Sequence, residues 1–399
     1  ENSKILLFDA DNDKDLDIYL ASGGVENSIY SEDLYDRLLI NDGKGNYRES
    51  NQKLPENGLR ISTSVVISDD IDNDGDEDLF VGERLKVGNY GLPGSGFILV
   101  NDGNGNFKNQ TDMIAPGLKK IGMITDAVFA DLNSDNSPDL IVVGEFMGIN
   151  ILLNQNGRFT PLSNNLSEEK GWWRSLLVED LNNDDMLDIL VSNHGLNSRF
   201  RATKSRPIKL YFNDFDKNGS AEGIICFSSE DGNEYPYALR QDLIGQIKSL
   251  KKKFPDFESF KDADITKIFD QNQLKGSIVS EINTLETSLY LNIGDFNFEK
   301  VSLPNQVQFS PIYSMKSFDF DKDGDKDLLM GGNQFKSRPE MGIYDASYGI
   351  YLENNGEARF EFFNGGKGFF TKGEIRDIVI MDDNVIVARN NDSLSLFKF

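Results

Sequence analysis

The residues in this sequence most suited to chemistry lie in a nine-residue loop of alternating acids. Counted from its first acid, the loop carries side-chain oxygens at positions 1, 3, 5 and 9, as in Asp319, Asp321, Asp323 and Asp327. Carboxylates this close repel one another strongly unless a cation lies between them. Hard oxygen ligands at this density suit Ca²⁺, which accepts six to eight oxygens at irregular angles. The loop is therefore predicted to bind a calcium ion.

Six copies of this loop define the predicted metal ligands. Position 7 is expected to offer its backbone carbonyl, so its side chain is free to vary. Position 6 needs a tight bend, for which Gly75, Gly219 and Gly324 are well suited and Lys14 is the poorest fit. We expect about five or six structural Ca²⁺ ions, and the loop that begins at Asp214 is the weakest copy. The residues at positions 1, 3, 5, 7 and 9 are Asp9, Asp11, Asp13, Asp15 and Asp17; Asp70, Asp72, Asp74, Asp76 and Asp78; Asp131, Asn133, Asp135, Ser137 and Asp139; Asp180, Asn182, Asp184, Met186 and Asp188; Asp214, Asp216, Asn218, Ser220 and Glu222; and Asp319, Asp321, Asp323, Asp325 and Asp327.

Each loop runs into a short apolar segment that reads as a strand. Position 12 is apolar, as in Val81 and Met330, whereas an EF-hand needs a bidentate Glu there and a helix after it. β-branched and aromatic runs such as 79–81 and 140–143 predict strands. A second recurring element is a strand that ends in Asn, followed by a Gly-rich turn and an aromatic residue, which is a hairpin signal.

The spacing of the loops indicates a repeat architecture. Most copies are about 50–60 residues apart, which is enough for one four-stranded blade and is typical of propellers or repeat arrays. Residues 375–397 keep the strands but lack the acids. We therefore predict an all-β fold, a β-propeller of seven blades, with six or eight as the alternatives. The last strand is expected to close the ring with the N-terminal segment.

One segment breaks the repeat. Residues 232–286 carry apolar side chains at helical spacing around 239–254 and again around 264–273. The sequence thus predicts one propeller over residues 1–399 with a helical insertion at 232–286 inside a blade. Because the chain starts at Glu1, almost directly in a strand, we expect it to be a fragment or processed product of a longer chain with upstream domains.

At this point the sequence resembles a known family. The loops look like FG-GAP/VCBS repeats, the calcium-loop blades of integrin-α-type β-propellers, and the resemblance runs over nearly the whole chain. It extends to bacterial proteins that carry FG-GAP repeats with an ASPIC/UnbV segment and are similar to cartilage acidic protein in their repeats. The resemblance implies the fold and the calcium, but little about activity. The stretches that carry it are 17–24, 36–43, 171–173, 195–197 and 344–346.

Composition narrows the functional classes. The net charge is −25, but 26 of the 66 acids lie in the six loops, which leaves 40 acids against 37 Lys and Arg elsewhere. No basic stripe interleaved with aromatics is present, which disfavours nucleic-acid binding. The sequence contains no run of about 18 apolar residues, so it predicts no transmembrane segment. Cys226 is single and cannot form an intrachain disulfide. Extracellular calcium modules bind Ca²⁺ with Kd of roughly 10⁻⁴–10⁻³ M. We therefore expect a bacterial protein, Bacteroidota-like, that is located on the outer face of the outer membrane, at the cell surface, or in the medium.

Candidate ligand-binding residues lie in long loops after the early calcium strands. In a propeller, equivalent loops converge at one end of the central channel, where aromatic, Arg and Asn side chains suit a sugar or peptide. The alternative is ordinary packing between blades. For the adjacent Trp172 and Trp173, at most one side chain is expected at the surface. The candidates are Arg84, Tyr90, Trp172, His194, Asn197, Arg338 and Tyr344.

Three functions follow from these features. The first is a calcium-stabilised, non-catalytic binding or adhesion module that takes a protein or glycan ligand at the cell surface. The second is an accessory lipoprotein of an outer-membrane uptake or assembly complex, with transporter or assembly proteins (SusC/SusD-like) as partners and the helical insertion as the docking surface. The third is a calcium-dependent glycan lyase or hydrolase. A single histidine and the absence of a Gly-x-Ser-x-Gly motif disfavour an enzyme.

Overall fold

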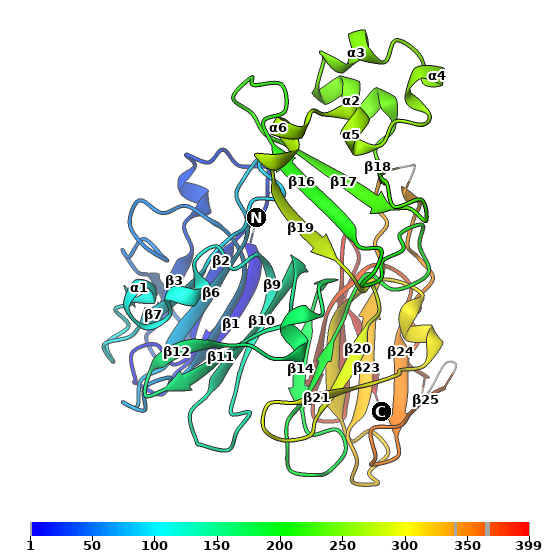
Figure 1. The fold of residues 1–399 in the computed structure, drawn as a ribbon. Helices are drawn as coiled ribbons and strands as arrows, with labels where there is room; N and C mark the ends of the chain where they lie inside the picture. The colour runs from blue at the N-terminus through cyan, green and yellow to red at the C-terminus, as the bar shows by residue number, and fades with distance from the viewer. Residues whose placement is uncertain (1, 339–340, 364–367, 399) are drawn as a thin grey trace.

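Each acidic loop joins the first two strands of an antiparallel sheet. The computed structural model describes residues 2–338, 341–363 and 368–398, which form a β-rich body with a smaller unit raised from one end (Figure 1). Seven sheets are present in these residues. Six of them, called sheets I to VI below, order their main strands as a meander. In sheet IV the second and third strands are separated in the chain by the segment that forms the seventh sheet.

The first three sheets carry the first three acidic loops. Sheet I contains β1 (Asn2–Phe8), β2 (Asp17–Ser22), β3 (Arg37–Asn41) and β4 (Tyr47–Glu49). Sheet II contains β5 (Ser62–Asp69), β6 (Asp78–Leu85), β7 (Gly96–Val100) and β8 (Lys108–Asn109). Sheet III contains β9 (Met123–Ala130), β10 (Asp139–Met147), β11 (Asn150–Gln155) and β12 (Arg158–Leu162), with the short β13 (Gly171–Trp172) paired to the end of β10.

The next three sheets continue the series. Sheet IV contains β14 (Leu176–Glu179), β15 (Asp188–Val191), β20 (Ser288–Asn292) and β21 (Phe298–Val301). Sheet V contains β22 (Ile312–Phe318), β23 (Asp327–Gly332), β24 (Ile350–Asn354) and β25 (Phe360–Phe362). Sheet VI contains β26 (Ile375–Met381), β27 (Asn384–Arg389) and β28 (Ser395–Lys398). Short helices connect some of these elements: η1 (Glu32–Leu34), α1 (Thr111–Ile114), η2 (Pro116–Leu118), η3 (Asn165–Glu168) and η4 (Asn305–Gln308).

The sheets stack face to face, and this explains the continuous apolar runs of their second strands. Successive side chains of a strand point to opposite faces. On β6, Leu79 and Val81 pack against sheet I, whereas Phe80 packs against sheet III. Each inner strand therefore needs apolar residues on both faces. Representative pairs across the successive interfaces are Tyr19 with Val66, Phe80 with Leu140, Ile141 with Ile189, Leu190 with Leu328, and Leu329 with Val387.

The seventh sheet is not part of this series. It contains β16 (Ile208–Asn213), β17 (Glu222–Ser228), β18 (Glu234–Pro236) and β19 (Ile278–Ile282), and it rises above the body together with the helices (Figure 1). β15 pairs directly with β20, with Ile189 opposite Tyr290, so the chain between them leaves sheet IV and returns to it. The prediction that the Asp214 loop belongs to a blade in the series is therefore wrong.

The raised unit has its own core. Between β18 and β19 the chain forms α2 (Arg240–Gln246), α3 (Leu250–Lys253), α4 (Phe257–Phe260), α5 (Ile265–Ile268) and α6 (Gln271–Lys275). The helical spacing correctly identified buried positions such as Leu243 and Ile265. The two expected helices are broken into five short ones, because Asp256, Asp264 and Asp270 each cap a new start. Cys226 is buried in the same core.

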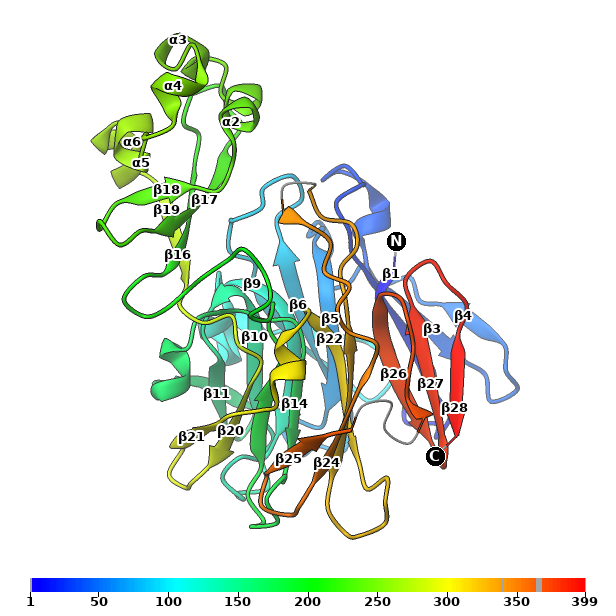
Figure 2. The ribbon, with the colours of Figure 1, turned by 90° about the vertical axis from the view of Figure 1, so that its right-hand side faces the viewer.

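The predicted pairing of the last strand with the N-terminal segment is not found among the described residues. Among the described residues β1 pairs only with β2, and β28 pairs only with β27. Figure 2 shows β26–β28 on the same side of the molecule as β1 and β3. Ser3 of β1 and Arg376 of β26 line one common cavity, so the first and last sheets border the same space. No helix in the described residues has the length and apolarity needed to cross a membrane.

A buried acid between sheets I and II makes a pH-dependent contribution to stability. Asp36 is 1% exposed and accepts hydrogen bonds from Ser22 N (2.6 Å), Tyr19 Oη (2.9 Å) and Thr63 Oγ1 (2.9 Å). Burial raises the pKa of Asp36 to about 7. The folded state therefore holds this proton more tightly than the unfolded state, in which the pKa is about 3.9. Stability from this group is present below pH 4 and is lost as the pH rises through 7.

We expect Asp36→Asn to flatten this pH dependence. At saturating calcium, the wild-type free energy of unfolding should fall by about 2–4 kcal/mol between pH 4 and pH 8, and the variant should lack most of that fall. The amide keeps the acceptor for Ser22, and the two hydroxyls can rotate to accept from it. Urea unfolding at several pH values measures the effect. Parallel curves for the two proteins would contradict it.

Candidate metal sites and a polar cavity

The acidic loops fold around the carboxylate at position 1. Asp70 Oδ1 accepts a hydrogen bond from Asp74 N (3.1 Å), and its Oδ2 accepts one from Gly75 N (3.0 Å). The same pair of bonds forms at Asp131, Asp180, Asp214 and Asp319. The predicted tight bend at position 6 is present in all six loops, with φ between 63° and 104°. Position 4, which the sequence analysis passed over, also has positive φ in every loop, as at Asn73 (61°) and Asn183 (61°).

The acid at position 9 anchors the loop to the sheet. Asp17 is fully buried; its Oδ2 accepts from Ala10 N (2.8 Å), and its Oδ1 accepts from Asn41 N (2.7 Å) at the end of the third strand. Both bonds recur at Asp139, Asp188 and Asp327. Burial raises the pKa of Asp78 to about 7, and raises the pKa values of Asp139 and Asp188 to about 6. A nearby cation would offset this cost of burying negative charge.

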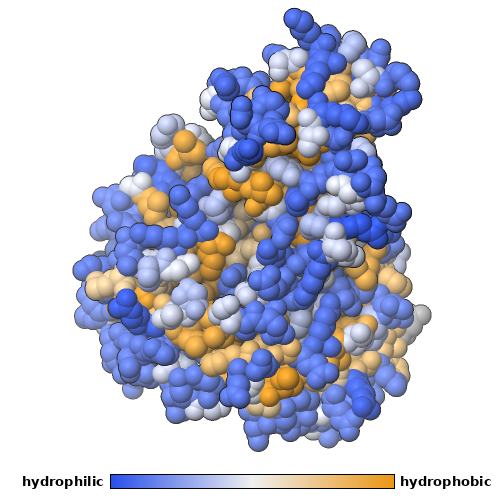
Figure 3. Space-filling model, in the orientation of Figure 1, coloured by the Kyte–Doolittle hydropathy of each residue, from blue (hydrophilic) through white to orange (hydrophobic). Residues whose placement is uncertain are grey.

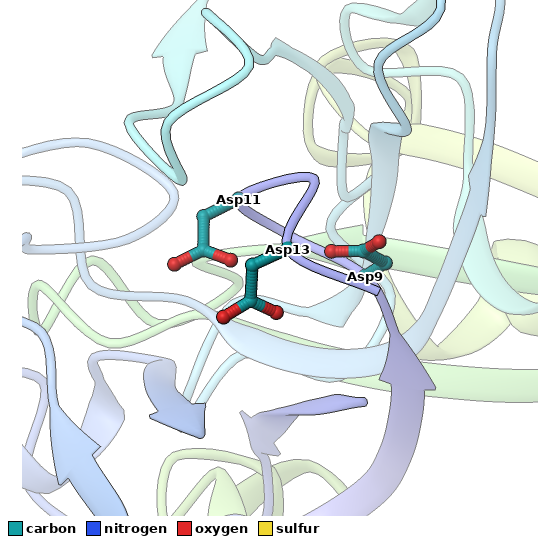
Figure 4. A group of neighbouring side chains, drawn as sticks. All are labelled: Asp9, Asp11 and Asp13. Atoms are coloured by element: carbon teal, nitrogen blue, oxygen red, sulfur yellow. The ribbon is translucent and has the colours of Figure 1, made fainter. Parts of the chain in front are cut away.

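The loop carboxylates converge as a metal site requires. In four loops, three carboxylates each place an oxygen within 4.8 Å of the others. Figure 4 shows Asp9, Asp11 and Asp13 of one such group on the loop after β1. The four groups are Asp9, Asp11 and Asp13; Asp70, Asp72 and Asp74; Asp214, Asp216 and Glu222; and Asp319, Asp321 and Asp327.

Several loop oxygens are buried without any donor, which tests whether a cation fits. Asp9 Oδ1, Asp11 Oδ1, Asp78 Oδ2, Asn182 Oδ1 and Asp216 Oδ1 have no hydrogen-bond partner. Buried acceptors are normally satisfied, so these orphans point to a missing positive ligand. The donor set is all oxygen and mostly anionic, which fits a hard divalent cation such as Ca²⁺. Burial, together with repulsion from the neighbouring carboxylates, raises the pKa of Asp11.

Position 7 has a role that the sequence did not suggest. Asp325 Oδ1 accepts a hydrogen bond from Asn183 Nδ2 (2.8 Å), and Asp76 Oδ1 accepts one from Asn12 Nδ2. In both pairs the donor is position 4 of the loop in the preceding sheet. The position-7 side chains of Asp76 and Asp325 therefore bond the loop of the preceding sheet. The contribution of the position-7 carbonyls to a metal stays a prediction.

A row of buried asparagines also ties neighbouring loops together. Asn154 lies near the end of β11; its Nδ2 donates to Pro138 O in its own loop (3.1 Å) and to Ile71 O in the loop of sheet II (2.8 Å). The other staples are Asn101 to Ala10 O, Asn292 to Leu132 O, and Asn354 to Leu181 O. The last of these links the loops of sheets V and IV, which again leaves the inserted sheet out of the series. The sequence showed these Asn residues only as strand ends.

We expect Asn154→Ala to lower the free energy of unfolding by about 2–3 kcal/mol, because it leaves buried carbonyls unsatisfied in two loops. Asn41→Ala is the matched control. Asn41 occupies the same position in sheet I, which has no sheet before it in the chain. Its Nδ2 therefore donates only to Leu16 O in its own loop (3.2 Å). Chemical denaturation with calcium present measures both variants. Equal losses would contradict the staple.

Comparison with known proteins agrees with this repeat geometry. A family model of the FG-GAP-like repeat matches residues 9–81, 70–142 and 131–191, each span running from one acidic loop into the next. The chain carries FG-GAP-like repeats. No curated protein matches the chain. Among solved structures, the crystal structure of the V. cholerae biofilm matrix protein Bap1 aligns over 97% of this chain and 74% of that chain, at 10% identity and a TM-score of 0.35.

Residues from all six sheets of the series, I to VI, line one polar cavity of about 480 Å³. The first strand of most sheets has a bulge near the cavity, where pairing skips one residue. A bulge re-aims a side chain away from the regular alternation. The skipped residues line the cavity: Ser3, Ser64, Thr125, Tyr313 and Arg376. Arg174, just before β14, occupies the matching place in sheet IV.

Two predicted ligand residues meet at a buried carboxylate beside this cavity. Glu145 is 1% exposed and accepts from Arg84 Nη2 (2.7 Å), Arg174 Nη1 (2.5 Å) and Tyr90 Oη (2.7 Å). The two guanidinium groups and the Tyr90 hydroxyl outweigh the cost of burial and lower the pKa of Glu145 to about 2. Glu145 and Arg174 were missed because no local sequence signal marks them. Arg84 and Arg174 also line the cavity.

Three other predicted residues gather in an aromatic cluster between the body and the inserted sheet. His194 stacks on Trp172 at 5.2 Å between ring centroids and meets Tyr344 edge-on at 4.7 Å. Burial lowers the pKa of His194 to about 3, so the ring is neutral. Trp172 Nε1, Tyr344 Oη and both His194 nitrogens lack partners. As expected for adjacent residues, Trp173 is fully buried, and its Nε1 donates to Met147 O (3.0 Å).

The two remaining predicted residues lie at the surface. Asn197 is exposed, and its Nδ2 donates to Phe309 O (3.2 Å) in a separate surface pocket. Arg338 is exposed on the loop after β23, and residues 339–340 of that loop lie outside the described residues. The predicted convergence of seven residues is therefore reduced to two neighbouring groups.

Proposed function

We propose that this chain is a calcium-stabilised, six-bladed β-propeller that acts as a non-catalytic ligand-binding module at a bacterial cell surface. Sheets I to VI are the blades, and the inserted sheet with its helices is an accessory unit on blade IV. The observation that carries the proposal is that the acidic loops and the polar cavity are built from different residues. The acidic loops link sheet to sheet through staples, whereas the bulged residues form a separate polar cavity.

Calcium in this proposal is structural. The ions would be held by side-chain oxygens at positions 1, 3, 5 and 9 of each loop, most of them carboxylates. They would neutralise charge that otherwise repels within and between the stapled loops. Loops of this type in extracellular modules bind Ca²⁺ weakly, with Kd of roughly 10⁻⁴–10⁻³ M, and are filled only at the calcium concentrations found outside a cell. This supports a location at the cell surface or in the medium.

The binding role is tested by two measurements on purified protein. Calorimetry should show calcium binding with a stoichiometry near five or six. A turnover screen on neutral and acidic glycans, with calcium present, should show no product. Robust turnover would overturn the non-catalytic role and favour a glycan lyase or hydrolase.

A second function is favoured by the surface of the inserted unit. β19 is an edge strand of the inserted sheet, and Ile278 and Val279 on it are 44% and 47% exposed. Figure 3 shows apolar surface at the base of this unit, where Figure 1 places β16 and β19. An open edge with apolar side chains can pair with a strand of a partner. This supports an accessory subunit of an outer-membrane uptake or assembly complex.

Affinity purification from the native envelope in mild detergent, with calcium present, distinguishes the two functions. Stable co-purification of one outer-membrane protein, lost on Val279→Lys, would establish the accessory subunit. Recovery of the protein alone would favour the free-standing binding module.

A further inference from the structure

The polar cavity has a cationic side, although the protein as a whole carries a net charge of −25. Arg84, Arg174, Lys336 and Arg376 line it, and Glu374 is the one carboxylate among its lining residues. Glu374 is paired with Arg376 Nη2 at 2.8 Å. Lys336 is exposed and forms no ion pair with any residue that the structure describes. The cavity wall is therefore a local reversal of the protein's charge.

The cationic side is ordered by stacking. The Tyr313 ring contacts two guanidinium groups, with Arg376 4.2 Å and Arg174 5.5 Å from its ring centroid. Arg174 also lies 5.6 Å from the Trp172 ring. Such contacts hold the planar guanidinium groups in fixed orientations, which lowers the entropy lost when they bind a ligand. The Tyr313 hydroxyl bonds Gln334 Oε1 (3.1 Å), which fixes the ring as well.

The arginines retain donors that the protein does not use. The Arg174 side chain is 9% exposed, and its Nε is buried without a partner, as is Arg84 Nε. Arg174 Nη2 has no hydrogen bond to a described residue. Both arginines share the single oxygen Oε1 of Glu145. The two Nε atoms are buried and out of reach of a ligand in the cavity. Arg174 Nη2, which is not among the buried atoms, is the donor left for a second acceptor.

The opposite side of the cavity is neutral and polar. Ser3, Ser64 and Thr125 line it, and their hydroxyls already donate to carbonyls of the next sheet, as Ser64 Oγ does to Ile124 O (2.7 Å). Ser62 adds a further hydroxyl group to the lining, whereas Gln334 and Asn390 lie beside the cationic side, bonded to Tyr313 and Glu374. A ligand that fits this cavity needs one anionic group on one side and hydroxyl groups on the other. The volume suits a ligand of one to a few sugar rings.

We propose that this cavity binds an acidic sugar, with the carboxylate of a uronic acid unit held by Arg174, Arg376 and Lys336 and its hydroxyls facing the neutral side. This inference rests on the proposed binding function and names its ligand class. Guanidinium groups pair carboxylates through two parallel hydrogen bonds, which a neutral sugar cannot satisfy. An acidic peptide offers the carboxylate but few hydroxyl groups, so the neutral polar wall favours the sugar.

The test is calorimetric titration of calcium-saturated protein with a trisaccharide of galacturonic acid. Its fully methyl-esterified form is the matched neutral probe, and a tri-glutamate peptide is the second acidic probe. We expect binding of the free acid, at least tenfold weaker binding of the ester and of the peptide, and an affinity that falls as salt rises. Equal binding of acid and ester, or binding of the peptide alone, would overturn the proposal.

Two variants locate the site. Lys336→Gln should weaken the acid about tenfold without altering the fold, because Lys336 is exposed and has no ion pair with a described residue. Arg376→Gln should weaken it at least as much. Arg158→Gln, on the outer strand β12, is the control and should bind as the wild type does. If the two cavity variants bind as the control does, the cavity is not the site.

The outcomes separate this inference from the proposed function. Thermal unfolding of the same sample shows whether calcium has stabilised the protein. A folded, calcium-stabilised protein that does not bind the trisaccharide overturns the ligand assignment alone. A protein that calcium does not stabilise, or that cleaves the trisaccharide, overturns the proposed function itself.

Discussion

Removal of calcium is expected to lower the melting temperature of this protein by about 10 °C or more. Ligands that bind only the folded state stabilise it by RT ln(1 + [L]/Kd), which is about 1.4–2.7 kcal/mol per site at roughly 10–100 times Kd. The acidic loops of sheets I to V are coupled through Asn staples, so their sites act on one cooperative structure. The combined effect over five loops is of the order of the whole stability of a typical domain.

Calorimetry with excess chelator, and then with a titration of Ca²⁺, measures this effect. Mg²⁺ at the same concentration is the control, and it should restore much less stability because it demands regular octahedral geometry and gives up water reluctantly. The variant Asp72→Asn tests a single site and should shift the calcium dependence of unfolding without abolishing it. An unchanged melting temperature in chelator would remove the calcium assignment.

The sequence predicted the acidic loops well because their geometry is local. Position 6 must turn within a few residues, and the predicted bend is present even where Lys14 or Asp185 replaces Gly. The all-β class followed from the same repeats, because apolar runs such as 79–81 have to be buried on both faces. Three of the four converging carboxylate groups lie in the loops with the most acids, those at Asp9, Asp70 and Asp319. The fourth lies in the loop at Asp214, which the sequence analysis ranked as the weakest copy.

The inserted sheet could not be recognised from its acidic loop, because that loop has the same residue pattern as the loops of sheets I to V. What decides its place is the pairing of Ile189 with Tyr290, which are about a hundred residues apart in the chain. A local signal did exist in the spacing. The loops at 180 and 214 are only 34 residues apart, too short for a four-stranded blade, and the next loop does not begin until 319.

The cavity residues were also beyond local inference. Arg174 and Glu145 belong to different sheets and meet only when sheets III and IV stack, so nothing in either segment marks them. The bulges that aim Tyr313 and Arg376 inward depend on pairing with the second strands of sheets V and VI. Arg84 and Tyr90 were predicted for their residue types. The structure gives them a common partner, Glu145, that the types alone do not reveal.

Loss of that partner is expected to have the second largest effect. Glu145→Gln should lower the free energy of unfolding by about 3–5 kcal/mol, because it leaves Arg174 buried without its counter-ion. Urea denaturation in saturating calcium measures this, and Glu299→Gln, at an exposed position of β21, is the control with an expected change near zero. A loss of less than 1 kcal/mol would mean that Glu145 does not hold sheets II, III and IV together.

The pH dependence gives an independent check on this carboxylate. Its folded pKa of about 2 lies below the unfolded value of about 4.3, so its stabilisation is fully present above pH 4.3 and is lost as the pH falls toward 2. Wild type and Glu145→Gln should therefore differ most at neutral pH and converge in acid. The freed guanidinium groups of Arg84 and Arg174 face the cavity, so a uronic acid should stabilise this variant more than it stabilises the wild type. The same stabilisation in both proteins would show that Glu145 does not affect the binding of anions in the cavity.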